Sequence, residues 1–260
     1  MAIAKQAPVA KATVASNLTT IDLRAALAAG WGDYKAHPIF GLFFASIYAF
    51  AGIFLSYALL VWGEYFWIVL AAAGFPLLAP FTAVGLYEVS RRREAGIAMS
   101  WKAVLGALRG HGDEQIMSMG VILFVAFGFW LMVAHGIFAI FMAEVGAGTG
   151  HLDFFLTGPG LAMLVVGSIV GGLMALAFYS ITVISLPMLV DRKVDFITAI
   201  IVSLATVRSN KFVMLAWAVF IAVSLFVAMV PAFLGLFVIL PVLGHATWHL
   251  YKRAVKHPNG

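Results

Sequence analysis

Two histidines near the end of the chain have the clearest spacing for chemistry. His245 and His249 stand four residues apart, so on a helix both imidazoles project from one face. Such a pair can bind a metal ion or form half of a haem site if a third ligand, such as Glu88, His37 or His111, approaches it. The pair equally suits an amphipathic helix end at the membrane surface. We favour that interpretation and predict no metal and no cofactor.

The sequence also lacks the residues that other chemistries need. There is no Cys, which excludes disulfides, iron–sulfur clusters and thiolate catalysis. Of the seven His, only His135 lies well inside a predicted span, so a haem–copper centre cannot be assembled. P-loop, H-E-x-x-H and G-x-S-x-G motifs are absent from the sequence. We therefore predict that the protein is not an enzyme.

The elements that must position these side chains are membrane spans. The chain is 63% hydrophobic and 10% charged, where soluble domains carry about 25% charged residues. A span needs about 20 apolar residues. Six segments meet or approach that length: Ile39–Trp62, Tyr65–Tyr87, Ile116–Met142, Thr157–Leu189, Phe212–Val230 and Phe233–Tyr251. The fourth is longer than a bilayer requires, so we expect it to tilt, to kink near Pro187 or to extend beyond the headgroups.

The basic residues predict which side of the membrane each loop occupies. All sixteen Lys and Arg fall in four patches: Lys5–Lys35, Arg91–Arg109, Arg192–Lys211 and Lys252–Lys256. Short loops rich in Lys and Arg stay in the cytoplasm. We therefore predict a multi-pass protein of a bacterial cytoplasmic (inner) membrane, with both termini cytoplasmic. Its net charge of +5 then faces anionic lipid headgroups rather than nucleic acid.

Each pair of spans is preceded by a short amphipathic segment: Ile21–Tyr34, Ser100–Arg109 and Asp195–Val207. In the first, Leu23, Leu27, Trp31 and Tyr34 share an apolar face, while Arg24 and Asp33 lie elsewhere. Asp22, Ser100 and Asp195 are expected to cap the three helices, because their side chains accept hydrogen bonds from the first helical turn. An aromatic residue opposite basic residues is typical of helices that lie in the interface plane.

These patterns together predict an all-α membrane protein with six transmembrane helices arranged as three hairpins, each preceded by a cytoplasmic interfacial amphipathic helix. Residues 19–251 form a single membrane domain, and residues 20–96, 97–192 and 193–251 are three copies of one unit. Residues 1–18 form a flexible cytoplasmic tail. Residues 252–260 form a second, basic cytoplasmic tail.

Two motifs at the cytoplasmic ends of spans suggest a family. The stretches Gly85–Gly96 and Gly244–Arg253 resemble DUF2189, a family of uncharacterised bacterial integral membrane proteins. The resemblance covers nearly the whole chain from about residue 20. It implies membership of a membrane family but no activity.

Several residues are candidates for contact with lipid or a partner protein. Arg91, Arg92 and Arg93 follow the second predicted span and can meet anionic headgroups or an acidic protein face. Trp101 opens the second amphipathic segment. Gly167 and Gly171 form a G-x-x-x-G seam, where small residues let helices approach closely.

The predicted function follows from the lack of charge inside the spans. None of the six segments contains Asp, Glu, Lys or Arg, whereas ion-coupled carriers place ionisable groups at mid-membrane depth. We therefore expect an accessory, assembly or organising subunit that packs against another inner-membrane complex, such as a respiratory one. The alternative is a channel or carrier for a small neutral or lipophilic solute. A cavity between the hairpins would be the structural sign of that alternative.

Overall fold

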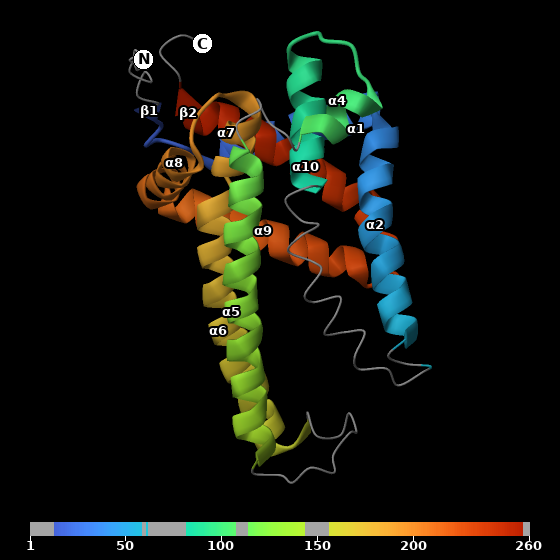
Figure 1. Ribbon diagram of the computed structural model, residues 1–260, viewed down its shortest axis with the longest axis vertical. Helices are drawn as coiled ribbons and strands as arrows, with labels where there is room; N and C mark the ends of the chain where they lie inside the picture. The colour runs from blue at the N-terminus through green and yellow to red at the C-terminus, as the bar shows by residue number, and fades with distance from the viewer. Residues whose placement is uncertain (1–12, 59–60, 62–81, 108–113, 144–155, 257–260) are drawn as a thin grey trace, which may run out of the picture.

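The computed structural model describes residues 13–58, 61, 82–107, 114–143 and 156–256. Within them, helices account for most residues and the strands are two residues long each, so the all-α prediction is confirmed. The helices are α1 (Thr20–Ala36), α2 (Pro38–Tyr57), α4 (Trp101–Gly106), α5 (Gln115–Ala143), α6 (Gly158–Thr182), α7 (Ser185–Asp191), α8 (Phe196–Ser209), α9 (Lys211–Met229) and α10 (Leu236–Ala254). A further helix, unlabelled in Figure 1, is described over residues 82–94. The strands are β1 (Thr13–Val14) and β2 (Val255–Lys256).

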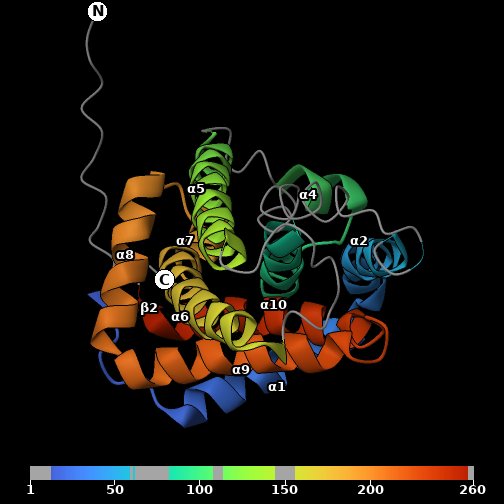
Figure 2. The same ribbon diagram turned by 90° about the horizontal axis from the view of Figure 1, so that it is seen from below.

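The helices run in two directions. α5 and α6 pack side by side and stand upright in Figure 1, while α9 runs across them. Viewed from below, α9, α10 and α1 lie next to one another, and α5, α2 and helix 82–94 are seen nearly end-on (Figure 2). Contacts between α1 and α10, and between α10 and α2, tie the two groups together. α10 is therefore the element around which the others assemble.

Within the described residues, four helices are long and apolar enough to cross a membrane: Pro38–Tyr57, Gln115–Phe141, Gly158–Asp191 and Lys211–Met229. They correspond to the first, third, fourth and fifth predicted spans. Most of the second predicted span, residues 65–81, lies outside the described residues. α10, the sixth predicted span, is not among the four. Its second half carries two His and two basic residues, and much of it is buried in protein.

The long fourth predicted span is broken just before Pro187. α6 ends at Thr182 and α7 begins at Ser185, since Pro187 has no N–H to donate to the carbonyl four residues back. The Ile184 N–H at the break donates to Ser203 Oγ of α8 at 3.2 Å. The Ser203 hydroxyl in turn donates to the Ser180 carbonyl at 2.7 Å. The expected kink is thus stabilised by a serine from another helix.

The three amphipathic segments are helices α1, α4 and α8, and two of the three predicted caps are correct. Ser100 Oγ accepts from the Ala103 N–H at 3.2 Å, and Asp195 Oδ1 accepts from the Thr198 N–H at 2.8 Å. The prediction for Asp22 was wrong: α1 begins one turn earlier, with Thr19 as its N-cap. The Asp22 carboxylate reaches back and accepts from the Thr19 N–H at 2.9 Å, which is the other half of a capping box.

The predicted orientation of α1 also needs correction. Leu23 is buried as expected, but Trp31 is 44% exposed. Asp33, assigned to the polar face, is only 1% exposed. α1 is packed on protein along the side that carries Asp33, because α10 covers it. A charged residue in that position must find partners inside the protein.

The two ends of the described chain meet. β1 pairs with β2 in antiparallel register, with Val14 opposite Val255. Asn210 at the α8–α9 junction donates to the Ala15 carbonyl at 2.7 Å and accepts from the Leu18 N–H at 3.0 Å. Residues 13–18, part of the segment predicted as a tail, are thus hydrogen-bonded to the folded body. Residues 14 and 255 must lie on the same side of any membrane that the helices cross.

The crossing of α1 and α10 depends on a glycine. A methyl group added to Gly30 of α1 would come within 2.5 Å of the backbone nitrogen of Ala246 in α10. Two residues further on, a methyl group added to Gly32 would meet its nearest neighbour, an Arg93 side-chain nitrogen, at an ordinary 3.7 Å. Of these two glycines, Gly30 alone is required for the close approach of α1 and α10.

We predict opposite effects for alanine at these two glycines. Gly30→Ala should destabilise the protein by about 1–3 kcal/mol, because backbone must move to admit the methyl group. Gly32→Ala, the matched control, should be neutral or stabilising by up to about 1 kcal/mol from helix propensity. Thermal unfolding in a mild detergent measures both. Equal effects of the two substitutions would contradict a close α1–α10 crossing at Gly30.

Candidate functional site

Several buried polar and charged side chains gather where α1, helix 82–94, α7 and α10 meet. We call this group the charged cluster. Its members come from four separate parts of the sequence: Asp33, Glu88, Ser90, Arg91, Arg92, Arg93, Glu94, Asp191, His245, Trp248, His249, Tyr251 and Lys252. Local helix formation cannot bring them together, so the cluster exists only in the folded chain.

Asp33 is the centre of the cluster. One carboxylate oxygen forms an ion pair with Arg93 of helix 82–94, and the other lies 2.8 Å from Nε2 of His249 in α10. Burial acts to raise the pKa of the Asp33 carboxyl, but hydrogen bonds from His249, Ser90 and Arg93 outweigh it and lower that pKa below its ordinary value. A single ionised carboxylate thus links three helices.

Ser90 connects this carboxylate to a second histidine. Its hydroxyl hydrogen-bonds to Asp33 and lies 2.8 Å from Nδ1 of His245, which is fully buried. A hydroxyl has one hydrogen, and a carboxylate can only accept. When Ser90 donates to Asp33, His245 must therefore donate from Nδ1, which leaves Nε2 unprotonated.

The combination of Ser, His and Asp is not arranged as a hydrolase triad. In a triad the carboxylate orients the histidine that activates the serine. Here Asp33 contacts Ser90 and His249, while Nε2 of His245 has no hydrogen-bond partner among the described residues. Ser90 is fully buried, so its hydroxyl is closed to a substrate. The arrangement serves to position helices.

Glu88 is held by two arginines of its own helix. Arg91 donates to both of its carboxylate oxygens, at 2.7 and 2.8 Å, and Arg92 lies 3.4 Å away. The Arg91 pKa is raised, because the hydrogen bonds to Glu88 favour the charged guanidinium. Arg92 also donates to the Ala98 carbonyl, which closes the turn before α4.

The end of α7 is joined to α10 in the same way. Asp191 Oδ2 accepts from the Tyr251 hydroxyl at 2.8 Å and lies 3.5 Å from Lys252. Glu94 accepts from the Trp248 indole N–H at 3.1 Å. Trp248 is fully buried, so it does not lie in an exposed aromatic belt at the membrane surface.

The two candidate metal ligands, His245 and His249, have different hydrogen-bond partners. His245 contacts Ser90, whereas His249 contacts Asp33. In the part of the chain that is described, no group of three or more His, Cys, Asp or Glu is placed to hold a metal ion. Of the suggested third ligands, Glu88 is occupied by arginines, and His111 lies outside the described residues.

The candidates for lipid or partner contact lie in different surroundings. Arg91, Arg92 and Arg93 each form an ion pair within the protein, although Arg93 remains 42% exposed. Trp101 is 38% exposed and packs against Phe40, with ring centres 4.4 Å apart. The guanidinium groups of the three arginines therefore bind carboxylates of the protein itself.

In the G-x-x-x-G motif, only one of the two glycines, Gly171, lies at a close contact with another described helix. A methyl group on Gly171 would come within 3.2 Å of Trp130 in α5. A methyl group on Gly167 would meet open space. The close approach of α5 and α6 is therefore local to Gly171, and the face around Gly167 is left uncovered by the described chain.

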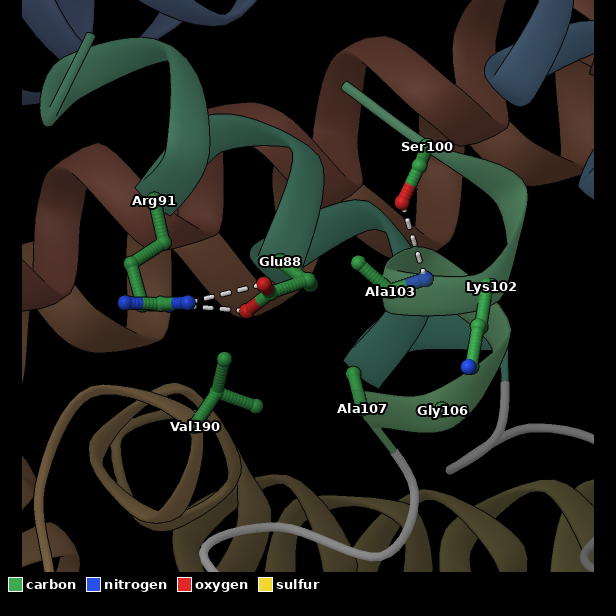
Figure 3. Close-up of a pocket in the computed structure, with 8 residues that line it drawn as sticks. All are labelled: Glu88, Arg91, Ser100, Lys102, Ala103, Gly106, Ala107 and Val190. Carbon is green, nitrogen blue, oxygen red and sulfur yellow. Dashed lines mark hydrogen bonds and ion pairs between the residues drawn. The ribbon is translucent and has the colours of Figure 1, made fainter. Parts of the chain in front are cut away.

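Two cavities border the charged cluster. The first, which we call the Glu88 pocket, has a volume of about 440 Å³ and lies between helix 82–94, α4 and α7. Figure 3 shows the Arg91 and Glu88 side chains pointing toward each other across its wall, with Val190 on the α7 side. Ser100 and Lys102 line it from α4.

The second, which we call the apolar cavity, has a volume of about 490 Å³ and lies between α5, α6 and helix 82–94. Its walls are largely aromatic and aliphatic, with Phe127, Trp130 and Phe178 among them. Tyr87 also lines it and is 5% exposed, yet no hydrogen bond of its hydroxyl to a described residue is found. A phenol hydroxyl can donate a hydrogen bond.

Sequence reasoning missed Asp33 and Tyr87. Asp33 was assigned to the polar face of an amphipathic helix, and the only available signal was its position beside Gly30 and Gly32, which permit close packing. Tyr87 was counted among the apolar residues at a span end. Nothing in the sequence indicates that its hydroxyl would face a cavity.

The apolar helices and the internal charged cluster define an all-α integral membrane protein. The model of the DUF2189 family, described as a predicted integral membrane protein, matches residues 67–191. The resemblance seen in the sequence is thereby confirmed over this segment. No curated protein and no solved structure matches the chain.

We predict that the charged cluster makes stability pH-dependent through Asp33. Because its pKa is lowered in the folded state, the stabilisation is fully present above the ordinary Asp pKa of 3.8 and is lost as pH falls through the folded-state pKa. At pH 7, Asp33→Asn should cost about 3 kcal/mol, the lower end for a broken buried pair, because Arg93 is partly exposed. The difference between the two proteins should shrink below about pH 4.

Asp195→Asn is the matched control for thermal unfolding in non-ionic detergent. Asn caps a helix about as well as Asp, so this exposed site should change stability by at most about 0.5 kcal/mol at pH 7. A pH-independent difference for Asp33→Asn would mean that the carboxylate is not ionised in the folded protein.

Proposed function

We propose that this membrane protein is non-enzymatic and binds a lipophilic molecule in the apolar cavity, as a carrier or binding protein for that molecule. The observation that carries the proposal is the cavity itself, of about 490 Å³ and lined mainly by apolar side chains. Small-molecule sites in proteins have volumes of about 300–1,000 Å³ and combine apolar walls with a few polar groups. The cavity matches both features.

Its location favours a ligand that arrives from the bilayer. Leu123, Phe127 and Trp130 of α5 line it, which places it about 12–22 Å along the helix from Gln115 at 1.5 Å per residue. α5 and α6 carry many exposed apolar side chains around it. A lipophilic molecule can therefore enter from lipid without crossing a polar surface.

Tyr87 supplies the polar group. A ligand oxygen that accepts from its hydroxyl would form a hydrogen bond worth about 0.5–1.5 kcal/mol. By contrast, the nearby Tyr179 hydroxyl already donates to the Met214 carbonyl at 2.8 Å. The ligand should therefore combine an apolar body with at least one hydrogen-bond acceptor.

The membrane topology that we propose for this role keeps the three hairpins and an even number of crossings, with α9 running across α5 and α6 rather than parallel to them (Figure 1). The pairing of Val14 with Val255 supports an even number of crossings, and the Lys and Arg distribution favours cytoplasmic termini in a bacterial inner membrane. In this arrangement α10 returns the chain to the side on which α1 lies. The lack of charge in the spans argues against coupling to ions.

Filling the cavity tests the proposal. Ala175 lines the cavity, whereas Ala177, on the same helix, does not. We predict that purified protein in mild detergent binds radiolabelled 1-oleoylglycerol saturably and that Ala175→Phe weakens binding by roughly tenfold or more, because the added ring occupies the site. Ala177→Phe should bind like the unmodified protein. Absence of saturable binding, or equal effects of both substitutions, would overturn the proposal.

A second candidate is the accessory or organising role. It is favoured by the candidate span Gly158–Asp191, in which only 6% of an apolar 18-residue stretch is buried. The uncovered face that the described residues leave around Gly167 also favours it. Small residues on an exposed helix face suit packing against another membrane protein. Gly167→Leu should then remove a partner that co-purifies from native membranes in mild detergent, without changing 1-oleoylglycerol binding. Co-purification that is unaffected would leave the carrier role alone.

A further inference from the structure

We propose that the ligand is an anionic acyl lipid, with its phosphate in the Glu88 pocket and its acyl chain in the apolar cavity. This inference rests on the proposed lipophilic site and adds the chemistry of the headgroup. It makes the Glu88 pocket a binding site and assigns a role to Lys102.

The two cavities share the same structural wall. Tyr87 lines the apolar cavity and the next residue, Glu88, lines the Glu88 pocket. On α7, Leu186 lines the apolar cavity and Val190 lines the Glu88 pocket. Residues four apart share a helix face and lie about 6 Å apart along the axis. The glycerol unit of a lipid bridges a separation of that size.

The charge of the Glu88 pocket suits a phosphate. The Glu88 carboxylate is already neutralised by Arg91, and Arg92 lies close to it as well. Lys102 adds a third cation, and no ion pair of its ammonium is found among the described residues. The pocket therefore has an excess of positive charge that an anionic headgroup complements.

Hydrogen-bond donors are also available in the pocket. Ser100 Oγ accepts from the Ala103 N–H, so its own hydrogen is free to donate to a phosphate oxygen. Figure 3 shows this hydroxyl above Ala103, on the α4 side of the pocket. Charged and hydroxyl donors on one side of a cavity are the usual means of holding phosphate.

The position of Trp101 favours a headgroup depth for the pocket. Trp101, next to Lys102, packs on Phe40 and Phe43 of the first turns of α2, with ring centres 4.4 and 5.1 Å apart. Tryptophan concentrates at the membrane–water interface. A lipid with its phosphate beside Lys102 would place its ester carbonyl deeper, toward the Tyr87 hydroxyl, and its acyl chain between α5 and α6.

The test compares two ligands that differ only in the phosphate. We expect purified full-length protein to bind 1-oleoylglycerol 3-phosphate at least roughly tenfold more tightly than 1-oleoylglycerol, as one charge-assisted contact can provide. Lys102→Gln should remove most of that preference. Lys193→Gln, which alters an exposed lysine outside the pocket, is the matched control and should keep the preference.

Each result separates the two proposals. Failure of 1-oleoylglycerol to bind overturns the lipophilic site itself. Binding of both ligands with equal affinity, or a preference that survives Lys102→Gln, overturns only the headgroup assignment. Competition by inorganic phosphate alone at concentrations that match the lipid would identify the pocket as a site for the free ion, which also contradicts the lipid assignment. Ala103→Leu, which narrows the pocket, should reduce the preference in parallel with Lys102→Gln.

Discussion

The rest of the structure depends on the burial of one carboxylate. Asp33 can remain ionised inside the protein only while Arg93, His249 and Ser90 surround it, because an isolated buried charge is very costly. Its partners come from two other helices, so α1, helix 82–94 and α10 must assemble together. The close crossing at Gly30 brings α1 near enough for this contact. Packing and charge therefore impose the same arrangement on these three helices.

That arrangement determines where the cavities lie. α10 packs against α1 on one side and against α2 on another. Helix 82–94 is held by the ion pairs at its charged end. Its residue Tyr87 lines the apolar cavity, and Glu88 lines the Glu88 pocket. The break before Pro187 lets α7 approach the same helix, where Leu186 lines the apolar cavity and Val190 lines the Glu88 pocket. A polar pocket and an apolar cavity thus adjoin, and the carboxylate that lines the pocket is paired. A charged pocket beside an apolar cavity is the arrangement that the proposed lipid site requires.

The sequence predicted features that depend on local pattern and composition. Apolar length located α2, α5, α6 and α9, and capping chemistry located the starts of α4 and α8. Features that depend on contacts distant in the chain were not predictable. The environments of Asp33 and Trp248 are set by residues 60 or more positions away, and an amphipathic pattern does not distinguish a face that meets lipid from one that meets another helix. Arg91, Arg92 and Arg93 were recognised as a basic run, but their carboxylate partners were not. Neither cavity has a sequence signature, because each is formed between helices.

The Asp33–Arg93 contact couples α1 to helix 82–94, and a double-mutant cycle measures that coupling directly. The free energy of unfolding in mild detergent at pH 7 is compared for the unmodified protein, Asp33→Asn, Arg93→Gln and the double variant. We predict a coupling energy of about 1–3 kcal/mol, with the double variant less destabilised than the sum of the single variants. Additivity to within about 0.5 kcal/mol would show that the two side chains act independently, and would contradict the dependence of the fold on this buried carboxylate.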